Sequence, residues 1–119
     1  MIVYDACKSG AALSGSSTGG AQEQRQLALL ARAQGLYILT ASTSQQYASE
    51  VKALGHGILT YAMLEGLRGK AAPSESQIKV ISLLAYAEQR VPALAKELRN
   101  RDQRPVRYGR GVNFPLANK

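Results

Sequence analysis

The chain is poor in the residues that crosslink proteins or bind metals, with one cysteine and one histidine among 119 residues. A single thiol excludes an internal disulfide, which fits a reducing compartment and makes the cytoplasm the expected location. The spacing of zinc ligands is absent. No apolar run approaches the roughly 18 residues of a membrane span. The N-terminus also lacks a basic segment followed by a long apolar core, so we expect neither a membrane span nor a signal peptide.

Acidic residues are scarce, since 15 lysines and arginines face 8 aspartates and glutamates and give a net charge of +7. Much of the excess lies late in the chain, in KELRNRDQRPVRYGRG. Such a balance raises nucleic acid as a partner. However, the run has no interleaved aromatic residue beyond Tyr108 and no zinc-ligand spacing. The pattern favours a solvated surface, and nucleic-acid binding remains an alternative.

The first third of the chain predicts two strands around a loop and a helix. Residues 2–4 are β-branched and aromatic and predict a buried strand that ends near Asp5. Residues 8–22 are mostly Gly, Ser, Ala and Thr, which indicates a flexible loop. Strong helix formers over 23–33 predict a helix. The apolar run LYILT at 36–40 predicts a strand buried on both faces.

Two more helices and an extended end are expected in the rest of the chain. Apolar residues spaced by three and four predict helices over 56–67 and 77–89. Pro92 should break the second helix or start a new turn, because proline inside a helix costs about 3 kcal/mol. Residues 94–98 then continue it. In the closing extended segment, Pro115 confines the chain to a sheet edge.

Strands that alternate with helices predict an α/β fold with a parallel pair of strands. Two apolar strands alone make a poor sheet, because each needs neighbours and a bare apolar edge invites aggregation. The chain is therefore expected to be part of a larger domain.

Polar and nucleophilic residues follow both predicted strands, where functional groups gather in α/β proteins. Cys7 comes just after the first strand and two residues after Asp5, and residues 42–46 follow the second strand. A thiol beside a glycine-rich loop is well placed as a nucleophile. A buried cysteine that acts as a small hydrophobe is the alternative, and position alone does not decide between them.

The residues DACKSG resemble the cysteine motif of caspase-like peptidases, in the metacaspase and bacterial caspase-like branch. Three further segments resemble the same family in the same order: LYILTASTSQQYASE, GHGILTYAMLEGLRGKA, and RVPAL with RYGRGVNFPLA. The resemblance covers nearly the whole chain. It implies a caspase-like sandwich, a mostly parallel sheet between helices. Residues 1–119 would be the C-terminal part of one peptidase domain, without its N-terminal strands and catalytic histidine.

The resemblance also assigns roles to residues of this chain. Cys7 would be the thiol nucleophile, and its backbone N–H would help to bind the oxyanion. Asp5 would line the primary specificity pocket and favour Arg or Lys before the scissile bond, because a carboxylate attracts these cations. Asp5 as a turn former at a strand end is the alternative. Ser42, Thr43 and Gln46 would border a groove in which an extended peptide pairs with a strand edge.

The chain departs from the family pattern in the position of the histidine that would serve as the catalytic base. A cysteine needs an adjacent base, which in caspase-like enzymes is a histidine about 50 residues upstream. Only six residues precede Cys7, and the one histidine, His56, lies downstream. The segment GHGILTYAMLEGL matches a later helix start of the family, where the histidine is not the base. We therefore expect the chain alone to be a weak or inactive peptidase.

The partners implied are a peptide or protein substrate and the N-terminal part of the same domain. No cofactor or metal is expected: some metacaspases need calcium, but no acidic cluster here indicates a site. A non-catalytic caspase-like interaction or regulatory module is a second hypothesis. Lys8 and Arg25 bracket the loop as candidate self-cleavage sites, although plain surface charge explains them as well.

Overall fold

The computed structural model describes residues 1–5, 25, 29, 36–41, 50, 51 and 55–119. These residues form a mixed α/β fold, as the alternation of strands and helices predicts. The strands are β1 (Ile2–Tyr4), β2 (Ile38–Thr40), β3 (Glu50–Val51), β4 (His56–Gly57), β5 (Gln77–Lys79), β6 (Val106–Tyr108) and β7 (Pro115–Asn118). The helices are α3 (Ile58–Glu65) and α4 (Val80–Arg99), with a wide helical turn, η2 (Gly66–Lys70), directly after α3.

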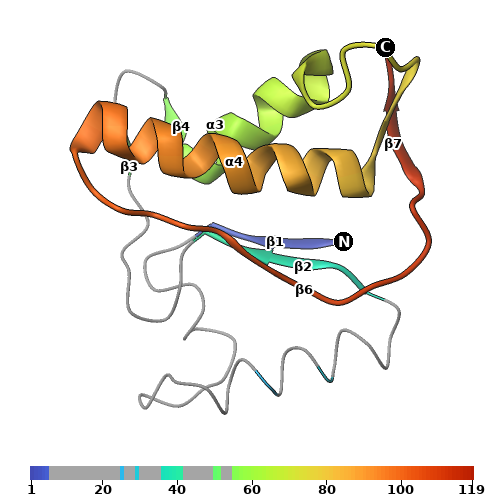
Figure 1. The fold of residues 1–119 in the computed structure, drawn as a ribbon, viewed down its shortest axis with the longest axis horizontal. Helices are drawn as coiled ribbons and strands as arrows, with labels where there is room; N and C mark the ends of the chain where they lie inside the picture. The colour runs from blue at the N-terminus through green and yellow to red at the C-terminus, as the bar shows by residue number, and fades with distance from the viewer. Residues whose placement is uncertain (6–24, 26–28, 30–35, 42–49, 52–54) are drawn as a thin grey trace.

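The central sheet has the strand order β1–β2–β6 (Figure 1). The expected parallel pair is confirmed: β1 runs parallel to β2, with Tyr4 opposite Thr40. Strand β6 lies antiparallel on the other side of β2, with Tyr108 opposite Ile38. Because β1 and β2 run in the same direction, their carboxyl ends lie next to each other at one end of the sheet.

Helices α3 and α4 cover one face of this sheet (Figure 1). The core lies between them and the sheet, and its fully buried side chains include Leu39 from β2, Ile58 and Leu59 from α3, and Leu83 and Leu84 from α4. Successive residues of a strand point to opposite faces. Both faces of β2 are buried, as its continuous apolar run predicts: Leu39 joins the core, and its neighbour Ile38 packs with Tyr108 in a second cluster.

Strand β1 forms where it is predicted, but its expected burial is wrong for this chain. Ile2 is 44% exposed and Val3 is 38% exposed. The reason is its position, since β2 is the only neighbour of β1 within the described residues and the outer edge of β1 is uncovered. An exposed apolar strand edge is the feature from which the sequence predicts that the chain is part of a larger domain.

Both later helices begin after their predicted starts, because short strands precede them. His56–Gly57 pairs with Glu50–Val51 as β4 and β3, so α3 begins at Ile58. Gln77–Lys79 pairs with β7, so α4 begins at Val80. These strands depend on partners elsewhere in the chain, and local periodicity does not show them. Of the predicted helix 23–33, only Arg25 and Leu29 are described, and both have helical backbone.

The proline expectations have opposite outcomes. Pro115 lies in a two-stranded sheet, opposite Lys79 at a register shift, so its edge position is confirmed. The break at Pro92 is wrong, because α4 runs through it to Arg99. Val91 on one side of the proline and Leu94 on the other are both buried in the core. Burying such side chains returns about 1.5–3 kcal/mol each, which is enough to offset the cost of the proline.

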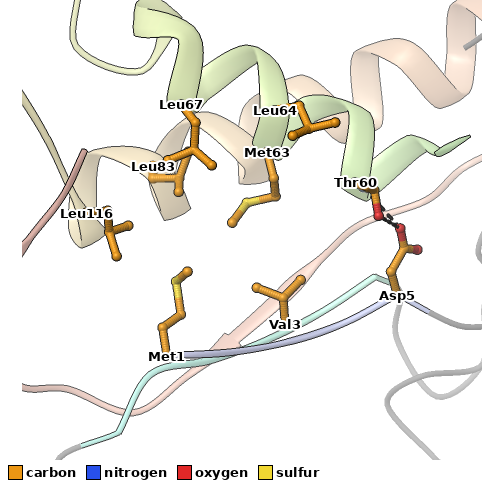
Figure 2. A pocket seen from close by; sticks show the side chains of 9 residues that line it. All are labelled: Met1, Val3, Asp5, Thr60, Met63, Leu64, Leu67, Leu83 and Leu116. Carbon is orange, nitrogen blue, oxygen red and sulfur yellow. Dashed lines mark hydrogen bonds between the residues drawn. The ribbon is translucent and has the colours of Figure 1, made fainter. Parts of the chain in front are cut away.

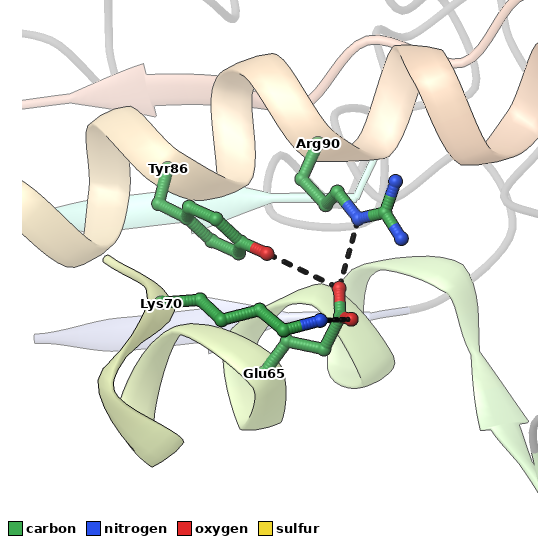
Figure 3. A network of polar contacts seen from close by, with 4 residues as sticks. All are labelled: Glu65, Lys70, Tyr86 and Arg90. Carbon is green, nitrogen blue, oxygen red and sulfur yellow. Dashed lines mark hydrogen bonds and ion pairs between the residues drawn. The ribbon is translucent and has the colours of Figure 1, made fainter. Parts of the chain in front are cut away.

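The end of α3 is tied to α4 through a buried carboxylate (Figure 3). Glu65 is 6% exposed, and its carboxylate accepts hydrogen bonds from Lys70 Nζ at 2.5 Å, Arg90 Nε at 2.8 Å and Tyr86 Oη at 3.2 Å. The hydrogen bond from Arg90 is the main cause that lowers the pKa of Glu65 to about 2, against the opposing effect of burial. The charged carboxylate therefore stabilises the contact between η2 and α4.

We predict that Glu65→Gln lowers the free energy of unfolding at neutral pH by at most about 3 kcal/mol. A carboxyl whose pKa is lowered by folding stabilises the protein above its unfolded pKa of about 4.5 and loses this contribution as pH falls toward 2. The difference between wild type and variant should therefore shrink from pH 5 to pH 2, as measured by urea unfolding.

The matched control is Glu75→Gln, a change at an exposed glutamate in the turn before β5. This variant should unfold within about 0.5 kcal/mol of wild type. If the difference in unfolding free energy between wild type and Glu65→Gln stayed constant down to pH 2, the role given to the ionised carboxylate would be contradicted.

Candidate functional site

The candidate site lies at the carboxyl ends of β1 and β2. Asp5 follows β1 directly, and Ala41 follows β2. Of the predicted site residues, Cys7, Ser42, Thr43 and Gln46 lie outside the described residues. Because Tyr4 pairs with Thr40, β1 and β2 end at neighbouring positions of the sheet.

Asp5 is the predicted site residue that the structure describes, and its carboxylate is bound to the start of α3 (Figure 2). Its Oδ2 atom accepts a hydrogen bond from the backbone N–H of Thr60 at 3.0 Å and a second from the Thr60 hydroxyl. The residue before α3 is Gly57, which has no side chain to cap the helix. Asp5 supplies that cap from another part of the chain. The end of β1 is thereby attached to α3.

Gly57 gives the Asp5 carboxylate its space. A Cβ atom on Gly57 would lie 2.7 Å from Oδ2 and 3.0 Å from Oδ1 of Asp5, closer than side chains can approach. Its backbone has φ −60° and ψ 153°, which any residue can adopt. Glycine is therefore favoured here by the close approach of the Asp5 carboxylate, which would have to shift to admit a Cβ atom, and not by backbone conformation.

An apolar pocket of about 480 Å³ opens beside Asp5 and Thr60, between β1 and the helices (Figure 2). Its lining is predominantly aliphatic or thioether, with side chains from Met1, Val3, Met63, Leu64, Leu67, Leu83 and Leu116. Met1, Val3 and Asp5 share this face of β1, as the strand period of two requires. The sequence predicts the apolar character of these positions, but not that they leave a space.

The C-terminal segment is attached to the end of β2 by a buried side chain. Gln103 is fully buried, and its Nε2 donates to the carbonyl oxygen of Ala41 at 2.9 Å. Thr40 is also fully buried, and its hydroxyl donates to the carbonyl oxygen of Val106 at 3.4 Å. These contacts fix the last residues of β2 before the segment of Ser42, Thr43 and Gln46. Sequence reasoning missed Gln103 and Thr60, because polar side chains in loops or helix starts carry no signal of distant partners.

His56 lies in β4, next to the glycine that contacts Asp5. Its backbone pairs with Val51 of β3. Its side chain lies outside the described part of the chain, so the expectation that His56 is not the base stays a prediction. Across the described ranges, no group of three or more His, Cys, Asp or Glu side chains could hold a metal ion. Within the same ranges, no helix has both the length and the apolar character needed to cross a membrane.

Comparisons with known proteins found no matching family model, no matching curated protein and no matching solved structure. What the chain does is therefore inferred from its own residues and their arrangement.

We predict that Gly57→Ala destabilises the protein by about 1–2 kcal/mol, because the new methyl group displaces the Asp5 carboxylate from its cap. Asp5→Ala should cost about 1 kcal/mol through the lost cap. In the Asp5→Ala background the new methyl group of Gly57→Ala meets no carboxylate. Gly57→Ala should therefore lower the free energy of unfolding clearly less in that background than in the wild-type protein. Thermal or urea unfolding of all four proteins gives the coupling energy.

Strictly additive effects in that cycle would contradict the contact between Gly57 and Asp5. The cycle needs no catalytic activity, so it tests the geometry of the site independently of any function.

Proposed function

We propose that this chain is the C-terminal part of a caspase-like cysteine endopeptidase domain. Completed by an N-terminal part that bears the histidine, it hydrolyses peptide bonds after Arg or Lys. The observation that carries the proposal is the placement of Asp5. Its carboxylate is held at the carboxyl end of β1, two residues before Cys7 and beside the end of β2. The single thiol of the chain supports a reducing compartment, the cytoplasm.

The chemistry assigned to Cys7 is acyl transfer. Its thiol loses a proton to the upstream histidine, and the sulfur attacks the carbonyl carbon of the scissile bond. The tetrahedral oxyanion accepts a hydrogen bond from the Cys7 backbone N–H, and then the C–N bond breaks as the histidine protonates the leaving amine. Water hydrolyses the resulting thioester and releases the free thiol.

The parallel pair β1–β2 supports the assignment of the substrate groove. Segments at the carboxyl ends of neighbouring parallel strands share one edge of a sheet, where ligands bind in α/β proteins. Ser42, Thr43 and Gln46 follow β2 in the sequence, as Asp5 and Cys7 follow β1. In the proposal they border the extended substrate.

The uncovered edge of β1 supports the need for an N-terminal part. Ile2 and Val3 are more than a third exposed, and the apolar pocket lies beside them. Exposed apolar edges are rare in isolated proteins because they promote aggregation. Further strands of the caspase-like sheet would pair with β1 and cover this surface.

The test is hydrolysis of fluorogenic peptides that end in Arg, Lys or Asp. We predict weak or no cleavage by the chain alone, because a thiol without its base is only a few per cent thiolate at neutral pH. Added to the N-terminal part of the domain, the chain should cleave after Arg and Lys and not after Asp.

Cys7→Ala should abolish that cleavage, whereas His56→Ala, a change outside the proposed catalytic pair, should leave it within a few-fold of wild type. Cleavage by the chain alone that is lost in both variants would make His56 the base and overturn the assigned roles. A completed protein that binds substrate but cleaves none of the peptides would instead indicate the non-catalytic regulatory module.

A further inference from the structure

The two oxygens of the Asp5 carboxylate have unequal surroundings (Figure 2). Oδ2 accepts both hydrogen bonds from Thr60, one from the backbone N–H and one from the hydroxyl. Within the described ranges, Oδ1 receives no hydrogen bond, and Asp5 forms no ion pair. Asp5 itself is exposed. The carboxylate is therefore held by one oxygen, while the other keeps its capacity to accept hydrogen bonds.

The partners of Asp5 differ in kind from those of the other acids that make side-chain contacts. Glu65 is paired with the cations Lys70 and Arg90, and Glu88 is paired with Arg107 at 3.3 Å. Asp5 is held by a neutral hydroxyl and an amide, which fix its position and leave its negative charge without a counter-ion in the described part of the chain. Such an acid is well suited to receive a cation from outside.

Gly57 leaves the space in which Thr60 holds the carboxylate. A Cβ atom on Gly57 would lie 2.7 Å from Oδ2 and 3.0 Å from Oδ1. An acceptor whose rotamer is fixed in advance loses less entropy when a ligand binds, which increases affinity and specificity.

We propose that Thr60 is a positioning residue for substrate specificity: it holds Oδ2 of Asp5 so that Oδ1 receives the guanidinium or ammonium group of the residue before the scissile bond. This inference rests on the proposed function, since Asp5 must be the acid of the specificity pocket. It adds a residue from the third position of α3, far from the cysteine motif in sequence. Thr60 acts through Asp5 and does not touch the substrate.

The test measures the binding of a capped arginine, N-acetyl-arginine amide, to this chain. Binding is monitored through the NMR chemical shifts of the backbone amides of Asp5 and Thr60. N-acetyl-citrulline amide is the matched uncharged ligand. We expect the arginine ligand to bind more tightly than the citrulline ligand. Asp5→Asn should remove that preference.

Thr60→Val keeps the shape and the backbone N–H of the residue but removes the hydroxyl donor. It should weaken arginine binding roughly ten-fold, because a hydrogen bond to a charged group is lost. Thr60→Ser restores the hydroxyl and should bind as wild type. Ser74→Ala, a change at an exposed residue in the turn before β5, is the surface control. Melting curves of each variant identify any loss of binding that comes from unfolding.

The outcomes separate this inference from the proposed function. If Asp5→Asn loses the arginine preference and folded Thr60→Val keeps it, Thr60 is not a positioning residue, while the role of Asp5 stands. If the wild-type chain shows no preference for arginine over citrulline, the specificity role of Asp5 fails, and the inference fails with it. In the completed enzyme, Thr60→Val should raise KM for Arg peptides with little change in kcat.

Discussion

The contact between the Asp5 carboxylate and the first turn of α3 connects the two layers of this fold where the proposed chemistry takes place. Asp5 ends β1, and Thr60 belongs to the helix that covers the sheet. Gly57 allows the carboxylate to approach, because a side chain there would collide with it. One interaction therefore caps α3, attaches the end of β1 to it, and leaves Oδ1 without a hydrogen bond from the described residues.

The two neighbouring parallel strands differ in burial: β2 lies in the buried core, whereas β1 lies at the edge of the sheet. Strand β2 is covered by β1, β6 and the helices, and its residues are almost fully buried. Strand β1 is similarly apolar but has no outer neighbour among the described residues, so Ile2 and Val3 remain exposed, and Val3 lines an apolar pocket. The same residue types are buried or exposed according to strand position, which is why the edge supports a domain completed by further strands.

Sequence reasoning predicted the elements with strong local patterns. The two apolar runs predicted β1 and β2, and the spacing by three and four predicted most of α3 and α4. It failed where a distant partner decides the conformation. Gln77–Lys79 has a helical pattern but pairs with β7, and Pro92 remains inside α4 because Val91 and Leu94 are buried on either side of it. In the candidate site, the cysteine motif singled out Asp5, whose functional role stays a prediction, whereas the contacts of Thr60 and Gln103 were missed because their partners are far away in sequence.

The amino-acid order alone predicts the α/β class and the parallel direction of the first two strands, and it carries the resemblance on which the roles proposed for Asp5 and Cys7 rest. These are local properties, because periodicity, turn residues and motifs are read within a few neighbours. Tertiary packing decides which oxygen of Asp5 is occupied, which glycine must lack a side chain, and which strand edge is left uncovered. Each of these depends on atoms that are dozens of residues apart in the chain, such as Asp5 and Thr60, and only the folded backbone brings them within hydrogen-bonding distance.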